Sequence, residues 1–235
     1  MLPLLESTDL DTSRTVRDPV KRAFSDMIGI VRGIGAALVT LLLGGAVCAQ
    51  SDWKPLFDGE SLKGWRETAF TGRGKVTVDG GAIVLGKGVL TGVTWSGEFP
   101  KFNYEIRLEA MKVDGHDFFA GLTFPVHDSF CTWINGGWGG MVVGLSSLDD
   151  MDASENDTSF RRTFESGRWY ALRLRVAEDR IQAWIDGELA IDTYFVTRVI
   201  GLRPGEIERS TPMGIASYST MAKLRKIEYR VLDSK

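Results

Sequence analysis

Cysteine and histidine are scarce in this chain of 235 residues, which contains two of each. Cys48 lies in an apolar N-terminal run, and Cys131 is the only cysteine that follows it. One cysteine cannot form an intrachain disulfide, so packing must stabilise the segment after the run. No partner motif surrounds Cys131, and we interpret it as a buried apolar thiol rather than a nucleophile.

Long basic runs and long helical stripes are also missing after residue 50. The net charge is −3, which leaves no electrostatic footprint for a nucleic-acid partner. In their place the chain has 27 glycines, seven tryptophans and many β-branched residues, a composition typical of an all-β protein with many turns. A length of 235 residues with 43% hydrophobic content predicts one sizeable globular domain.

The N-terminal region differs from the rest of the chain. Residues 33–50 carry no charge, follow Arg32 and end in small residues, a pattern typical of a signal peptide. We predict a signal peptide over residues 27–49 and a single domain over residues 50–235, exported to the periplasm or the extracellular space. Residues 1–26 are polar without periodicity and are interpreted as a misassigned or disordered extension.

Two alternatives to cleavage keep the protein at a membrane. The first is a lipid anchor on Cys48, and the second is an uncleaved apolar anchor, although the run is short for a span. We expect no other association with a membrane.

Several segments have the alternating pattern of strands in antiparallel sheets. Asp79-Gly80-Gly81 joins two β-branched runs as a hairpin turn, and residues 102–109 alternate between an apolar and a wet face. Residues 169–192 predict a three-stranded meander, and a bulge near Lys226 would restore the register of the last strand. Such strands, with turns every few residues, predict a two-sheet sandwich or jelly roll with a concave face.

The segment 131–157 combines tryptophans, paired glycines, serines and acids between strand-like neighbours. Aromatic rings stack on apolar sugar faces while polar groups bind hydroxyls, so this mixture indicates a carbohydrate or glycoside ligand. The alternative is a tight hairpin with core tryptophans. Trp53, Trp65, Trp169 and Trp184 lie in strand patterns and are predicted to be core. The candidate sugar-binding residues are Trp133, Asn135, Trp138, Ser146, Ser147 and Asp149.

The two histidines are the natural general bases at neutral pH. His116 and His127 each precede an aspartate, and we take His116, His127 and Asp128 as catalytic candidates. The alternative places both histidines in surface loops.

The acids after residue 148 are hard oxygen ligands suited to Ca²⁺. We predict a candidate cation site at Asp150, Asp152 and Glu155, which lacks the glycine of an EF-hand loop. The alternative is a solvated acidic loop neutralised by Arg161 and Arg162. No other cofactor is indicated.

Motifs at both ends of the domain resemble a known family. They are WKPLFDGESLKGW at residues 53–65 with the hairpin at 76–84, GRWYALRLRV at 167–176 with RIQAWIDG at 180–187, and GIASYST at 214–220 with LRKIEYR at 224–230. Together they are similar to the 3-keto-disaccharide hydrolase family, formerly a domain of unknown function. The resemblance implies a concanavalin A-like jelly roll of two antiparallel sheets, export, and action on 3-keto glycosides in bacterial sugar catabolism.

Three functions remain open at this point. The first is cleavage of a 3-keto glycoside in a concave sugar groove, by elimination and hydration or net hydrolysis. The second is a noncatalytic carbohydrate-binding or cell-surface interaction module on the same fold. An enzyme acting on ordinary glycosides ranks last because no carboxylate pair stands out.

Overall fold

The computed structural model describes residues 52–233. The predicted extension at 1–26, the signal peptide at 27–49 and the Cys48 anchor lie outside the described residues. Within residues 52–233, no helix is long and apolar enough to cross a membrane.

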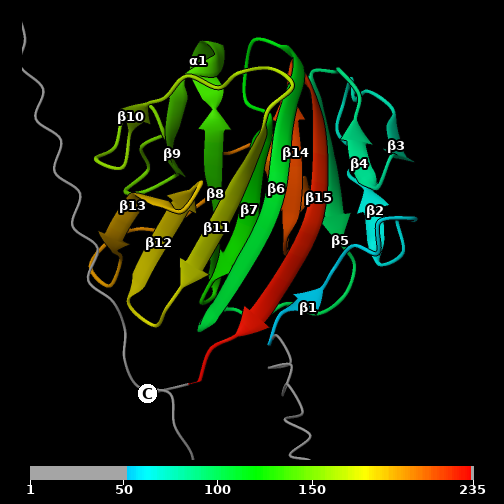
Figure 1. Cartoon of the computed structure of the whole chain (residues 1–235). Coiled ribbons are helices and arrows are strands. Elements are labelled where there is room, and N and C mark those ends of the chain that lie inside the picture. Colours follow the sequence, from blue (N-terminus) through cyan, green and yellow to red (C-terminus); the bar gives the residue numbers. More distant parts are fainter. Residues whose placement is uncertain (1–51, 234–235) are drawn as a thin grey trace, which may run out of the picture. The chain divides into compact units, whose positions relative to one another are not determined.

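Two antiparallel sheets face each other in this domain (Figure 1). The larger sheet has eight strands in the order β13-β12-β11-β6-β15-β4-β3, and β1 also pairs with β15. In that order the bounds are Glu188–Tyr194, Arg180–Ile185, Trp169–Val176, Tyr104–Gly115, Thr220–Val231, Ala82–Leu85 and Val76–Asp79, with β1 at Lys54–Pro55.

The smaller sheet has seven strands in the order β10-β9-β8-β7-β14-β5-β2. Their bounds are Phe160–Arg161, Val142–Ser146, Ser129–Gly136, Ala120–Val126, Gly214–Tyr218, Leu90–Trp95 and Trp65–Glu67. Two short helical turns, α1 at Gly137–Gly140 and η1 at Glu206–Ser210, are the helices among residues 52–233. The predicted all-β, concanavalin A-like sandwich of two antiparallel sheets is therefore confirmed.

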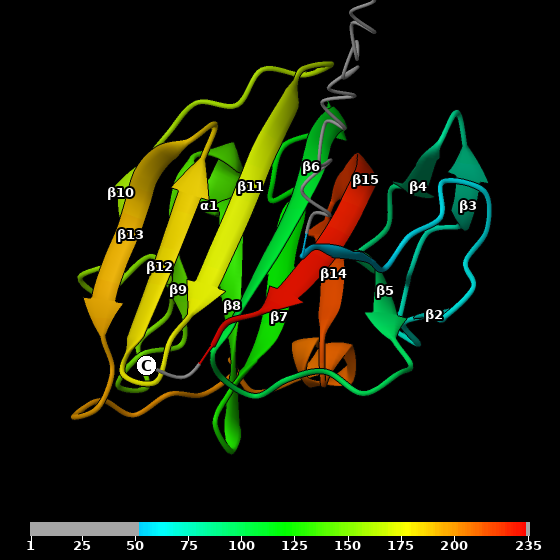
Figure 2. The same cartoon turned by 60° about the horizontal axis from the view of Figure 1, so that its bottom comes forward.

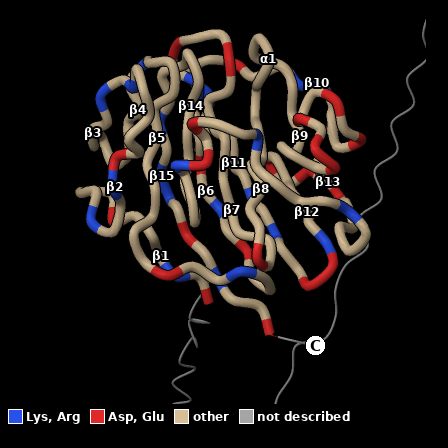
Figure 3. Tube along the Cα trace, turned by 180° about the vertical axis from the view of Figure 1, so that it is seen from behind, with Lys and Arg blue, Asp and Glu red and all other residues tan. Residues whose placement is uncertain are grey.

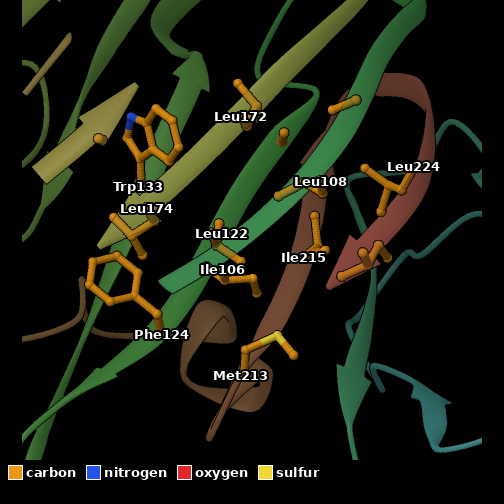
Figure 4. Packing of buried hydrophobic residues seen from close by; sticks show 14 of the residues in the cluster. Ile106, Leu108, Leu122, Phe124, Trp133, Leu172, Leu174, Met213, Ile215 and Leu224 are labelled. Carbon is orange, nitrogen blue, oxygen red and sulfur yellow. The ribbon is translucent and has the colours of Figure 1, made fainter. Parts of the chain in front are cut away.

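The core fills the space between the sheets (Figure 4). Period-2 alternation sends every second side chain of a strand inward, as in β11, where Leu172 and Leu174 are buried. Leu122 and Trp133 meet them from the smaller sheet. Burial of this apolar area is the main stabilising contribution in a domain whose only described cysteine is unpaired.

The local turn predictions are confirmed. Asp79 and Ala82 close the β3–β4 hairpin, and Gly80 and Gly81 both have positive φ. The register of β15 against β6 shifts between Arg225 and Glu228, where Lys226 has φ 51°. Strands β11, β12 and β13 form the predicted meander.

The outer face of the larger sheet corrects one prediction. Trp169 and Trp184 are half-buried rather than core, because they lie on the outer face and each packs under a guanidinium. Arg173 lies 3.8 Å from the ring centroid of Trp184, and Trp53, next to β1, likewise packs under Arg107 and Arg230. Of the four tryptophans predicted to be core, Trp65 is buried.

Candidate pocket on the smaller sheet

The outer face of the smaller sheet carries several short side chains. Thr132 and Ile134 of β8 point outward because Cys131 and Trp133 point into the core. Ser146 lies beside Thr132, and Gly121 lies beside Ile134. Short side chains along neighbouring strands allow other segments to approach the sheet closely.

Glycines mark where those segments cover the sheet. A Cβ on Gly121 would lie 3.0 Å from the Phe118 ring, and one on Gly144 would lie 2.7 Å from the Ala153 carbonyl oxygen. Gly214 lies equally close to η1, which is seen in orange beside β14 in Figure 2. The covering segments leave a hollow between them.

That hollow is a pocket of about 350 Å³. Its size is within the range of small-molecule sites. The sheet, the loops on either side of β7 and β8, and the segment before β14 all contribute to its walls. The lining residues are Leu90, Asp117, Phe118, Thr132, Ile134, Trp138, Ser146, Arg203, Pro204, Glu206, Ile207 and Tyr218.

Two exposed aromatic side chains mark the rim. Trp138 is 41% exposed and Tyr218 is 39% exposed. The Tyr218 ring stacks with Phe118 at a centroid distance of 5.9 Å. Rings held partly open to solvent offer apolar faces to a sugar or to another ring.

A left-handed turn presents Trp138. Its φ is 46° and its ψ is 59°, and the flanking glycines allow the chain to make the turn. The Gly139 N–H donates to Asp117 Oδ2 (3.0 Å), and the Phe118 N–H donates to Asp117 Oδ1 (2.8 Å). Asp117 therefore fixes the turn against the neighbouring loop, and Trp138, a candidate sugar-binding residue, lines the pocket.

A polar network lies at the β9 side of the pocket. The Ser146 hydroxyl donates to Asp152 Oδ1 (2.9 Å), and Asp152 forms an ion pair with Arg203 (3.2 Å). Ser147 is buried and exchanges backbone hydrogen bonds with Gly201. These contacts fasten residues 200–203 to the sheet as one wall of the pocket.

Acidic residues gather in the loop between β9 and β10 (Figure 3), and Arg198 and Arg203 form ion pairs with three of them. Arg198 pairs with Asp149 (2.9 Å) and with Asp157 (2.7 Å). Hydrogen bonds from the Val199 N–H and from Arg198 lower the pKa of Asp149. Asp149 is thus a structural anchor outside the pocket, which corrects its predicted role in sugar binding.

The predicted cation site is wrong. Among residues 52–233, no three His, Cys, Asp or Glu side chains are placed to hold a metal ion. The Asp152 carboxylate is directed to Ser146 and Arg203, the Glu155 carboxylate accepts the Asp152 N–H, and Asp150 is exposed. Arg198 and Arg203 form the ion pairs of this loop, whereas the alternative to a cation site named Arg161 and Arg162.

Two predicted sugar-binding residues lie in the interior. Trp133 is fully buried among core residues, so it cannot stack on a ligand. Asn135 is also fully buried, and its side-chain amide donates to the Ala120 carbonyl oxygen (3.1 Å). Both predictions are wrong because strand alternation turns these side chains away from the pocket.

The histidines do not meet. His116 is exposed next to Asp117, before β7, whereas His127 occupies the turn after β7. Seven strand residues separate those ends by roughly 20 Å. His127 stacks on Phe102 (5.0 Å between centroids) and is hydrogen-bonded to the Glu178 carbonyl oxygen.

Asp128 lies beside His127, away from the pocket. It pairs with Lys101 (2.8 Å), which lowers the pKa of its carboxyl group. None of the catalytic candidates His116, His127 and Asp128 is among the residues that line the pocket.

Most residues of the pocket wall are not among those predicted from the sequence; Trp138 and Ser146 are. Tyr218 and Leu90 are opposite one another on β14 and β5, and both point outward by strand alternation, which could have been read from the sequence. Arg203, Glu206 and Ile207 come from the segment before β14, whose placement depends on contacts distant in sequence. Glu206 accepts the Thr71 N–H (2.7 Å) and pairs with Arg209 (3.2 Å).

The two facing antiparallel sheets define the chain as a concanavalin A-like sandwich, a fold shared by carbohydrate-active and carbohydrate-binding proteins. The family described as the 3-keto-alpha-glucoside-1,2-lyase-like domain matches residues 52–230. The chain belongs to this family, as its terminal motifs indicate.

Solved structures share the fold at low sequence identity. A candidate glycosyl hydrolase from Parabacteroides distasonis ATCC 8503 is 14% identical over 77% of this chain and 94% of its own, with a TM-score of 0.51. The carbohydrate recognition domain of Emp47p is 12% identical over 78% of this chain and 97% of its own, also with a TM-score of 0.51. No curated protein matches the sequence.

Proposed function

We propose that the pocket binds the sugar of a 3-keto glycoside and that this chain cleaves the glycosidic bond. The observation that carries the proposal is the placement of Trp138 at the rim, next to the Asp117 carboxylate, in a pocket that Arg203 also lines. The reaction requires a base, an acid and a group that stabilises the enolate, while a ring such as Trp138 would position the sugar.

The chemistry uses the acidity that a C3 ketone gives to the C2 hydrogen. A base removes that proton, the C1–O bond breaks with its electron pair moving to the leaving oxygen, and that oxygen takes up a proton. Water then adds across the C1–C2 double bond, so the net reaction is hydrolysis. An enolate forms before the bond breaks, and a nearby cation stabilises its charge.

Asp117 is the base in this proposal. Each of its oxygens accepts one backbone N–H, which fixes the carboxylate and leaves further lone pairs for a proton. Arg203 is held at the pocket by Asp152 and stabilises the enolate. The Tyr218 hydroxyl is a proton donor that also lines the pocket.

The test uses the ultraviolet absorbance of the enone or the release of an aglycone from a 3-keto glucoside. Asp117→Asn should lower turnover by at least about 100-fold while the sugar still binds. Asp128→Asn is the matched control, because Asp128 is an exposed aspartate outside the pocket, and it should leave turnover unchanged. Equal turnover by wild type and Asp117→Asn would contradict the role of this base.

Binding without cleavage is the second candidate. It is favoured by the fact that both carboxylates lining the pocket, Asp117 and Glu206, already accept backbone N–H groups. A 3-keto glucoside that binds to the wild type but is not converted would support this function and refute catalysis. Export to the periplasm or the extracellular space is part of either proposal, and cell fractionation tests it.

A further inference from the structure

The polarity of the pocket lining changes from one side of the sheet to the other. Ser146 lies opposite Thr132, Thr132 opposite Thr123, and Thr123 opposite Gly214 in β14. These three strand gaps place β9 and β14 roughly 14 Å apart. Ser146 of β9 and Tyr218 of β14 both line the pocket, so it spans several strands and has room for two rings side by side.

Its β9 side is polar. There Ser146 and Thr132 present hydroxyls, and Arg203 is held in place by Asp152. Trp138 comes from the turn after β8, and Asp117 comes from the loop before β7, the next strand toward β14. Hydroxyl, guanidinium and carboxylate groups around one ring suit a sugar.

Its β14 side is apolar. Tyr218 faces Leu90 across the β14–β5 pair, and its ring is backed by Phe118. Ile207 of η1 adds an aliphatic wall. Glu206 nearby is already bound by Thr71 and Arg209, so its charge is compensated. A second sugar ring would leave many of its hydroxyls without partners on this side.

We propose that the substrates of this pocket are glycosides with an aromatic aglycone, the sugar lying on the β9 side and the aglycone ring between Tyr218, Leu90 and Ile207. This inference rests on the proposed function and narrows it from 3-keto glycosides in general to aryl 3-keto glycosides. A flat apolar ring would bury the exposed face of Tyr218 more completely than a hydroxylated sugar ring would.

The test compares three probes on the full chain by tryptophan fluorescence before turnover: phenyl 3-ketoglucoside, methyl 3-ketoglucoside and a 3-keto glucose disaccharide. We expect the phenyl compound to bind on the order of tenfold more tightly than the methyl compound and more tightly than the disaccharide. Tyr218→Ala and Leu90→Ser should bring the phenyl-to-methyl ratio close to one.

Two variants outside the pocket are matched controls. Tyr194→Ala removes an exposed tyrosine of β13, and Val89→Ser alters the exposed neighbour of Leu90, so both should keep the wild-type ratio. Equal affinities for phenyl and methyl compounds, or tightest binding of the disaccharide, would overturn the aryl preference alone. If none of the three probes binds, the sugar site itself is wrong and the proposed function falls with it.

Discussion

Replacing Trp138 with alanine tests the pocket most directly. A tryptophan side chain buries up to about 250 Å² when fully covered. Trp138 is 41% exposed, so about 100 Å² is open and a sugar stacked on one face would cover about half of it. At about 25 cal/mol per Å², the lost burial is about 1.3 kcal/mol, or nearly tenfold in Kd.

Titration of wild type and Trp138→Ala with methyl 3-ketoglucoside measures this loss. Trp138→Phe keeps a ring in the same turn and should recover much of the affinity. Trp184→Ala is the control, because that tryptophan packs under Arg173 on the larger sheet and is remote from the pocket. Unchanged affinity in Trp138→Ala, with an unchanged melting temperature, would refute the stacking role.

Two further predictions concern groups outside the ligand site. The Cys131 thiol is buried, which raises its pKa to about 12. In a Cys48→Ser variant it should react with a thiol reagent at pH 8 about a thousandfold more slowly than after unfolding, and equal rates would contradict its burial. Asp149 has a pKa below its ordinary value because of Val199 and Arg198, so its stabilising contribution is complete above about pH 5 and is lost as the pH falls through the folded-state pKa. Asp149→Asn should lower the melting temperature at pH 7 but much less at pH 3, with Asp150→Asn as the control, and a loss independent of pH would contradict the linkage.

The elements that depend on neighbours in sequence could be predicted. The Asp79-Gly80-Gly81 turn and the bulge at Lys226 each depend only on local backbone conformation, so the local sequence was enough to predict both. Trp133 shows the limit of the same reasoning. Composition marked it as a ligand platform, yet one residue of strand alternation separates it from Thr132 and Ile134, which do line the pocket. The role of Trp133 is set by the face of the strand that it lies on, rather than by its residue type.

The site itself is set by contacts that are far apart in the chain. The segment before β14 contacts two distant loops. Arg203 pairs with Asp152, which is 51 positions away, and Glu206 binds Thr71, which is 135 positions away. No local pattern of residues predicts these two contacts, because each depends on how the fold brings distant loops together at the ends of the strands. The acidic loop follows the same logic. From the sequence its carboxylates resemble calcium ligands. In the structure three of them form ion pairs with Arg198 and Arg203, and these pairs hold the pocket wall against the sheet.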